Sequence, residues 1–196
     1  MFTIVEGKRI PMMPGDVLLT PNWHWHGHSN ESSANAYWLD FLDVPLVHFL
    51  GPMLFEHHPD GMERHAPVDA ASPMRFSWEA TRVQLAEAPE TVPGRREIKL
   101  DNPALASINL CAMHVACRSS FRHGPTTANA IFAVIEGRGA CTVDEHGFVW
   151  TKGDVIAVPT GCTMMCRTTE DSYFLKVADE PLFQHLGWLR PLITAR

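Results

Sequence analysis

The residues best suited to chemistry form one short run, Trp23-His24-Trp25-His26-Gly27-His28. Side chains on a β-strand alternate between its two faces, so His24, His26 and His28 are expected to share one face. Imidazoles are common ligands of first-row transition metals, and three on one face could hold such an ion. The alternative is a surface histidine cluster, or core imidazoles satisfied by hydrogen bonds. The density of the run favours a metal-binding or catalytic role.

A carboxylate candidate, Asp40, follows His28 by twelve residues, inside the apolar run 36–42. A hairpin would place a strand at 36–42 beside a strand at 22–28. Asp40 could then accept the N–H of a histidine and fix its tautomer. An exposed loop acid is an equally weighted alternative.

The elements that must position these residues are short β-prone runs, separated by Gly, Pro and Asp. This spacing is typical of a β-sandwich or barrel. The predicted strands are 3–5, 10–13, 17–20, 23–28, 36–42, 97–100, 107–115, 130–135, 140–143, 148–150, 155–158, 163–168 and 173–177. Short helices are expected at 47–56, 77–88 and 181–188.

Two segments resemble each other, residues 5–23 and residues 135–161. Each has a hydrophobic residue followed by Glu-Gly, a short hairpin, a Gly-Asp-Val turn and a strand that ends at proline. Self-similarity of this kind indicates an internal duplication. The sequence therefore predicts two similar β units, of which the first starts late.

Composition excludes several functional classes. The 196 residues carry a net charge of −6 and show no Lys/Arg run, which argues against a nucleic-acid partner. No apolar stretch is long enough to span a bilayer, and the N-terminus lacks a signal-peptide pattern. The five cysteines are odd in number and form no CxxC pair, so a disulfide framework is not expected and the reducing cytoplasm is the predicted location.

A longer motif extends the histidine run from Pro14-Gly15-Asp16 through Leu19-Thr20-Pro21-Asn22 to Ser29-Asn30-Glu31. With this motif the chain resembles the cupins, and specifically the gentisate 1,2-dioxygenases and their relatives that act on salicylate and 1-hydroxy-2-naphthoate. The resemblance implies an all-β bicupin of double-stranded β-helix (jelly-roll) fold, with the first barrel incomplete and short helices in the linker and at the C-terminus. It implies a partial N-terminal cupin at 1–50, a linker at 51–95, and a C-terminal cupin with a terminal helix at 96–196.

The same resemblance implies an Fe(II)-dependent dioxygenase that opens the ring of a hydroxylated aromatic carboxylic acid with O₂, in a homo-oligomer. It assigns His26 as a metal ligand, His28 as a histidine that assists proton transfer, and Asp40 as the acid that orients it. Leu42 is expected to face the substrate. Gentisate, salicylate and 1-hydroxy-2-naphthoate stay open as substrates.

Two departures from the family pattern concern the metal. The first two iron ligands of the family come from an early H-x-H motif, whose expected place lies before Thr3. In the second cupin, Phe121 stands where a histidine is expected, and His123 remains. Met164 and Cys166 occupy the positions of His26 and His28, so a packed apolar interior is favoured there over a Cys/Met/His copper site.

Three functional hypotheses follow. The chain is part of a ring-cleaving dioxygenase whose activity in isolation is in doubt, or a catalytically inactive cupin module that binds a small aromatic acid or a partner chain. The third is a structural remnant whose open strand edges pair with another chain.

Overall fold

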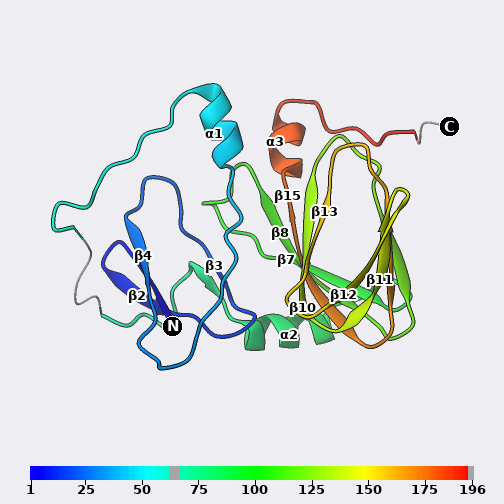
Figure 1. Ribbon diagram of the computed structural model, residues 1–196, viewed down its shortest axis with the longest axis horizontal. Helices are drawn as coiled ribbons and strands as arrows, with labels where there is room; N and C mark the ends of the chain where they lie inside the picture. Colours follow the sequence, from blue (N-terminus) through cyan, green and yellow to red (C-terminus); the bar gives the residue numbers. More distant parts are fainter. Residues whose placement is uncertain (62–66, 194–196) are drawn as a thin grey trace. The chain divides into compact units, whose positions relative to one another are not determined.

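The computed structural model describes residues 1–61 and 67–193, and contacts divide the chain into two compact units (Figure 1). We call Met1–Ala80 the first unit and Thr81–Arg196 the second unit. The division into 1–50, 51–95 and 96–196 stays a prediction. In the described ranges, no helix has the length and apolar character needed to span a membrane.

Two small antiparallel sheets and one helix make up the first unit. One sheet has the order β2-β1-β4, and the other pairs β3 with β5. The elements are β1 (Phe2–Val5), β2 (Lys8–Pro11), β3 (Val17–Leu18), β4 (His26–Ser29), α1 (Val44–Leu50) and β5 (Arg75–Phe76). The turn between β1 and β2 places Glu6 and Gly7 at φ 46° and 73°, which suits a tight two-residue hairpin.

The β2-β1-β4 sheet buries one face. Thr3, Val5 and Ile10 are nearly inaccessible to water, and strand pairing places Thr3 opposite Ile10. Thr3 also lies opposite His28, and Val5 lies opposite His26. Directly paired residues project from the same face of a sheet, so both histidines project from the buried face.

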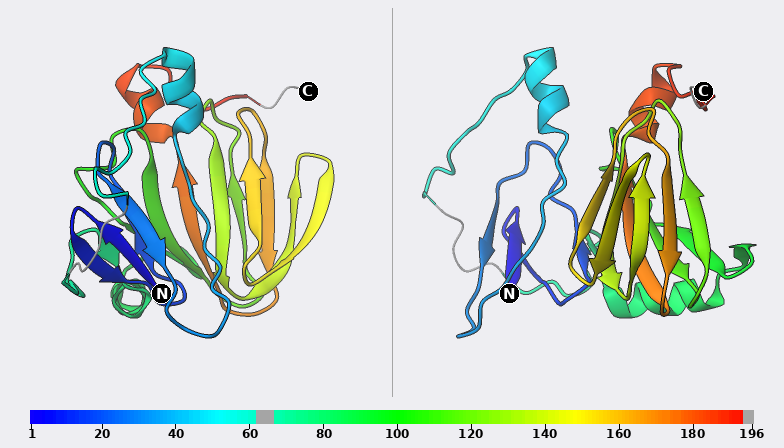
Figure 2. Two further views of the ribbon diagram at one scale, coloured as in Figure 1. Left: turned by 60° about the vertical axis from the view of Figure 1, so that its left-hand side comes forward. Right: turned by 45° about the vertical axis from the view of Figure 1, so that its right-hand side comes forward.

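Two larger antiparallel sheets form the second unit, with the orders β13-β10-β15-β8-β7-β6 and β12-β11-β14-β9. Figure 2 shows these sheets facing each other. The strands are β6 (Glu90–Val92), β7 (Arg95–Lys99), β8 (Asn109–Val115), β9 (Ser120–His123), β10 (Ala130–Glu136), β11 (Arg138–Val143), β12 (His146–Thr151), β13 (Val155–Val158), β14 (Met164–Thr168) and β15 (Ser172–Ala178). Helix α2 (Trp78–Glu87) leads into this unit, and α3 (Glu180–His185) follows β15.

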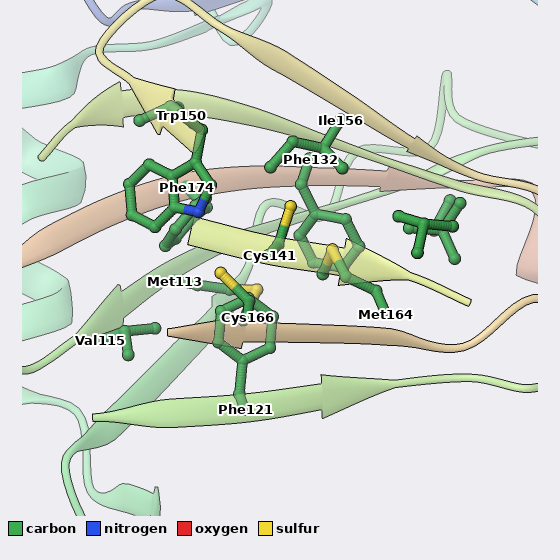
Figure 3. Packing of buried hydrophobic residues seen from close by; sticks show 14 of the residues in the cluster. Met113, Val115, Phe121, Phe132, Cys141, Trp150, Ile156, Met164, Cys166 and Phe174 are labelled. Carbon is green, nitrogen blue, oxygen red and sulfur yellow. The ribbon is translucent and has the colours of Figure 1, made fainter. Parts of the chain in front are cut away.

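The interior of the second unit is a continuous apolar cluster contributed by both sheets (Figure 3). Phe132 and Phe174 come from the larger sheet, and Phe121, Met164 and Cys166 come from the smaller one. Each of these side chains is at most 5% exposed. Period-2 alternation in β11 and β14 directs every second residue into this cluster, which confirms the predicted all-β architecture.

The two units repeat each other at a constant spacing of 138 residues, as from Asp16 to Asp154 and from Pro21 to Pro159. The carboxylate of Asp16 accepts the backbone N–H of Met13 at 2.9 Å, and that of Asp154 accepts the N–H of Thr151 at 2.8 Å. The internal duplication is therefore supported by equivalent hydrogen bonds.

The hairpin contacts repeat as well. The Glu6 carboxylate accepts the Trp25 N–H at 2.9 Å, and the Asp144 carboxylate accepts the Thr163 N–H at 2.8 Å. This spacing corrects the alignment of the two repeats that the sequence suggested. Residues 5–17 correspond to residues 143–155, and not to the segment that starts with Glu-Gly after residue 135. It keeps Met164 and Cys166 as the counterparts of His26 and His28.

Three predicted elements of the first unit are wrong in place or type. Residues 36–42 form no strand, and the strand predicted at 23–28 begins only at His26. The helix predicted at 47–56 lies at Val44–Leu50, because Pro45 suits its first turn and Gly51, at φ 90°, ends it. The predicted helix at 77–88 is confirmed by α2.

Candidate metal centre on strand β4

Two imidazoles project side by side from β4. His26 and His28 are separated by one residue, and their ring centroids lie 6.1 Å apart. Both side chains are exposed in this chain, although they share the face on which Thr3 and Val5 are buried. The pair therefore lies on the interior side of the sheet but is open to solvent.

His26 is held in an orientation suited to metal binding. Its Nδ1 lies 3.1 Å from the backbone carbonyl oxygen of His24, so that Nδ1–H donates to this oxygen. A neutral imidazole with its proton on Nδ1 carries a free lone pair on Nε2. A backbone carbonyl at Nδ1 is a common outer partner of metal-binding histidines, since it fixes the ring and the tautomer.

His28 is anchored through Thr3. Its Nδ1 lies 3.0 Å from the Thr3 hydroxyl, which donates its own proton to Met12 Sδ at 2.8 Å. With the hydroxyl proton directed at this sulfur, the Thr3 oxygen accepts a hydrogen bond from His28 Nδ1–H, and the His28 Nε2 is then the unprotonated ring nitrogen. The Trp38 ring lies 5.1 Å from the His28 ring and shields one side of it from water.

The charge state of His28 follows from this setting. Desolvation by its neighbours lowers the pKa of His28 below its ordinary value, Asp40 acts in the opposite direction, and His26 adds to the lowering. The neutral form of His28 is therefore favoured at neutral pH, as both ligand binding and proton acceptance require.

The other two predicted site residues lie in the irregular segment before α1. Asp40 is exposed and acts on His28 through its charge. The sequence predicted that a strand at 36–42 would place Asp40 near His28. In the structure this segment forms no strand, and the contact of Trp38 with the His28 ring holds it near His28 instead. Leu42 is 64% exposed, and its role toward substrate stays a prediction.

His24 lies outside strand β4, which begins at His26. Trp23 adopts φ 64°, and the turn it forms precedes the strand. The His24 Nδ1 instead lies 2.9 Å from the carbonyl oxygen of Asn22. Strand pairing therefore places two of the three expected imidazoles, those of His26 and His28, on one face.

Comparison with known proteins supports the family suggested by the motif. Residues 1–42 match the cupin domain family model. The chain is 31% identical to a gentisate 1,2-dioxygenase of Streptomyces sp, over 97% of this chain, and 29% identical to a 5-aminosalicylate 1,2-dioxygenase of Comamonas sp, also over 97%. All of the chain aligns with the structure of salicylate 1,2-dioxygenase from Pseudoaminobacter salicylatoxidans as its gentisate adduct, at a TM-score of 0.88 and 23% identity, which shows the fold.

The chain belongs to the gentisate, salicylate and 1-hydroxy-2-naphthoate dioxygenase family of bicupins. It spans 63% of the length of the Streptomyces relative, 59% of the Comamonas relative and 63% of the salicylate dioxygenase chain. The predicted cupin fold is confirmed.

The described residues of this bicupin chain do not form a complete iron site. Within residues 1–61 and 67–193, no group of three or more His, Cys, Asp or Glu side chains lies close enough to hold one metal ion. His26 and His28 offer two imidazole donors, whereas a ferrous oxygenase site needs at least three protein ligands. A metal centre here requires donors from beyond these residues.

The second unit shows which strand would bring such donors. In its smaller sheet, β9 pairs with β14, which is the counterpart of β4, and places His123 opposite Met164 and Phe121 opposite Cys166. The first unit has counterparts of β12, β11 and β14 in β2, β1 and β4. In the described part of the chain, no strand pairs with the other edge of β4.

The equivalent positions of the second unit are packed rather than open. Met164 and Cys166 are at most 1% exposed, and the expected apolar interior is confirmed. Burial raises the pKa of Cys166 to about 12, so its thiol stays protonated. Burial also lowers the pKa of His123 to about 4.

Sequence reasoning missed Thr3 and Trp38 as partners of His28. Thr3 lies twenty-five residues away, on a strand whose register with β4 cannot be read from local pattern. Trp38 belongs to a run that was assigned to a strand. The sequence did contain one indication for Thr3. Thr3 alternates with Val5 along a predicted strand, so both side chains were expected on the same face of that strand.

Proposed function

We propose that this chain carries one part of the ferrous site of a gentisate-type ring-cleaving dioxygenase, with His26 as a metal ligand. The observation that carries the proposal is the His26 imidazole. Its Nδ1 is fixed on the His24 carbonyl, while its Nε2 projects from the buried face of the sheet next to an open strand edge. Family membership supplies the reaction class.

The remaining ligands are proposed to lie on a strand that pairs with β4 as β9 pairs with β14. The residue opposite Met164 is His123, which precedes it by forty-one positions. The same spacing from His26 falls before Met1. The two residues opposite His26 and His28 would project from the face that carries the imidazoles, where an H-x-H pair would complete the set.

We propose that His28 accepts a proton during the reaction and that Asp40 assists it. His28 is favoured in its neutral form, and the Asp40 charge stabilises the imidazolium that forms when a proton arrives. Leu42 is proposed to contact the aromatic ring. The substrate is a hydroxylated aromatic carboxylic acid, such as gentisate, salicylate or 1-hydroxy-2-naphthoate, which reacts with O₂ in a homo-oligomer in the cytoplasm.

The test compares this chain with a form extended at its N-terminus by the segment that precedes Met1. We expect the extended form to bind iron stoichiometrically and to consume oxygen with at least one of the three acids. His26→Ala should lower both iron content and oxygen uptake by about 10-fold or more, because a ligand is lost. His24→Ala, at a histidine outside the strand, is the matched control and should retain both. An extended form without iron and without oxygen uptake would refute the proposal.

A second candidate is a catalytically inactive cupin module that binds a small aromatic acid or a partner chain. It is favoured by the lack of a three-donor group among the described residues. It predicts calorimetric binding of an aromatic acid that is the same with and without iron. Oxygen consumption by the extended form would reject it.

A further inference from the structure

We infer that the second unit carries a binding site for a phosphate group, borne by a small phosphate ester or present as the free ion. The site is a hollow of about 540 Å³ that is lined by Arg118, Ser120, Arg167, Thr168 and Thr169. All five residues belong to the second unit, in the turn before β9 and at the two paired strands β9 and β14. The inference does not depend on the ferrous site proposed above.

Strand pairing brings one arginine and the serine together. Arg167 of β14 lies directly opposite Ser120 of β9. Their neighbours Phe121 and Cys166 are buried in the apolar cluster. Because side chains alternate along a strand, Arg167 and Ser120 project from the outer face of the smaller sheet. Both groups therefore line the hollow from a hydrogen-bonded pair of strands, which fixes their spacing.

The turn between β8 and β9 supplies the second arginine. Arg118 takes φ 57°, in the left-handed region that is uncommon for residues other than glycine. Thr168 holds this turn, since its hydroxyl donates to the Ala116 carbonyl oxygen at 2.7 Å and accepts the Ser119 N–H at 3.1 Å. Thr168 is 1% exposed, so a buried side chain of β14 anchors the backbone that carries Arg118.

The arginines at the hollow have no carboxylate partner among the described residues. The ion pairs of residues 1–61 and 67–193 include none with Arg118, with Arg167 or with the neighbouring Arg122. Arg122 lies opposite Met165 and hence diagonally from Arg167, and diagonal neighbours are about 7–8 Å apart. Three permanently charged guanidinium groups thus gather on one face of a chain whose net charge is −6.

The two carboxylates that follow Thr169 in the sequence bind other groups. Glu170 forms an ion pair with Arg138 at 3.2 Å. The Asp171 carboxylate accepts the Cys117 N–H at 2.9 Å and lies 3.6 Å from Nε2 of His114. Arg138 therefore has its charge balanced within the chain, in contrast to the two arginines of the hollow.

Two guanidinium groups and a hydroxyl suit a phosphate group. Guanidinium groups donate in parallel pairs to anionic oxygens, and such charge-assisted bonds are about twice as strong as neutral ones. The Ser120 hydroxyl is a further donor, whereas the Thr168 and Thr169 hydroxyls donate to backbone carbonyl oxygens.

The charge and lining of the hollow favour phosphate over a carboxylic acid. A phosphate monoester carries about −1.5 to −2 charges on a single group, so one phosphate faces both arginines, whereas a carboxylate balances only one of them. Among the described residues that line the hollow, none has an aromatic or purely aliphatic side chain. The hollow therefore suits a phosphate group better than it suits a hydroxylated aromatic acid.

The test is isothermal titration calorimetry with inorganic phosphate and, separately, with glycerol phosphate. Both this chain and the N-terminally extended form are titrated, at low ionic strength because salt screens exposed charges. We expect saturable binding at a single site per chain in both forms, with malonate, a dicarboxylate, binding more weakly. Tighter binding of glycerol phosphate would identify an ester as the ligand, and tighter binding of inorganic phosphate would identify the free ion.

Substitutions locate the binding to the hollow. Arg118→Gln and Arg167→Gln should each weaken phosphate binding by about 10-fold or more, because charge-assisted hydrogen bonds are lost. Both residues are exposed, so thermal unfolding should be unchanged. Lys152→Gln makes the same change in net charge in the turn after β12, at a residue that does not line the hollow, and should retain binding.

Four outcomes would overturn the inference. The first is no saturable phosphate binding, and the second is binding by this chain but not by the extended form. The third is an equal loss in Lys152→Gln, which would indicate a general effect of charge, and the fourth is malonate binding as tight as phosphate binding. Iron content and oxygen uptake of the extended form are separate measurements, so failure here is distinguishable from failure of the proposed function.

Discussion

His123 links the protonation state of the second unit to its stability. Burial, with a smaller contribution from Lys176, lowers its pKa to about 4, and Glu180 opposes the shift. The ring packs on Phe132 at 5.2 Å between centroids. Because the unfolded chain takes up a proton near pH 6.5 and the folded chain does not, stability is lost as the pH falls from about 6.5 to about 4.

We therefore predict that the free energy of unfolding falls by about 2 kcal/mol across this pH window, after discounting for partial exposure of the ring. His123→Phe should remove most of this pH dependence. Urea unfolding between pH 4 and pH 7 measures the effect. Burial raises the pKa of Glu180, but the hydrogen bonds from Lys176 and Asn109 together with the nearby positive charge lower it overall from 4.5, so its contribution to stability is lost at the acid end of this window and below it. Parallel slopes in both proteins would contradict the prediction.

Asp16 stabilises the first unit through several contacts at once. Its side chain is 2% exposed, and it accepts hydrogen bonds from the backbone N–H of Trp78 at 2.8 Å and from Arg75 Nε at 2.9 Å, in addition to Met13. Asp154 makes the equivalent turn contact, and its residue is exposed. The repeat thus offers two aspartates with the same local role and different burial.

Asp16→Ala should destabilise the first unit by about 3 kcal/mol, because the largely buried Arg75 guanidinium loses its carboxylate partner and two backbone N–H groups lose their acceptor. Asp154→Ala should cost about 1 kcal/mol, the value of a single exposed hydrogen bond. Hydrogen exchange of residues 74–78 and thermal unfolding report the difference. Equal losses from both substitutions would show that burial of Asp16 does not matter.

At the level of elements, the close packing of β11 against its neighbours requires glycine at position 139. A Cβ there would lie 2.1 Å from the carbonyl oxygen of Arg167 and 2.5 Å from the Trp150 ring. Gly147, on the adjacent strand β12, would place a Cβ in open space. Alanine substitutions at these two positions therefore distinguish the effect of a steric clash from the general effect of replacing glycine in a strand.

We predict that Gly139→Ala lowers the free energy of unfolding by about 2–3 kcal/mol through overpacking, because backbone and an indole ring must both move. Gly147→Ala should change it by no more than ~0.5 kcal/mol. Urea denaturation of both variants is the measurement. A Gly139→Ala variant as stable as the Gly147→Ala variant would disprove the packing argument.

At the level of the whole molecule, the two units differ in how much they bury. The described buried residues of the first unit are Thr3, Val5, Ile10, Leu19 and Ser72, whereas the second unit holds the continuous apolar cluster. Hydrophobic burial is the main favourable contribution to folding. We therefore expect the second unit to fold when it is separated from the first, and the first unit not to fold by itself.

A fragment of residues 78–196, which keeps α2 intact, should unfold cooperatively in urea. A fragment of residues 1–80 should show no cooperative transition, since too little apolar area is removed from water. Circular dichroism and one-dimensional NMR of both fragments provide the test. A cooperative 1–80 fragment would mean that its two small sheets suffice.

Much of this protein could be predicted where the signal was local. The alternation of side chains placed His26 and His28 on one face, the Gly-Asp-Val turns marked the repeat, and the apolar alternation of β11 and β14 indicated the core. The motif around His26 also pointed to the family. All of these depend on neighbours a few residues apart, which the sequence displays directly.

Contacts between distant segments were decided only by the tertiary structure. Thr3 anchors His28 because β1 pairs with β4 in one register. Trp38 reaches the same ring without forming a strand, and the turn at Trp23 leaves His24 outside β4. The strand neighbours of β4 among the described residues belong to this second class as well. Whether a strand edge is covered depends on which segments meet across the sheet, and backbone hydrogen bonds of that kind leave no pattern in either segment alone.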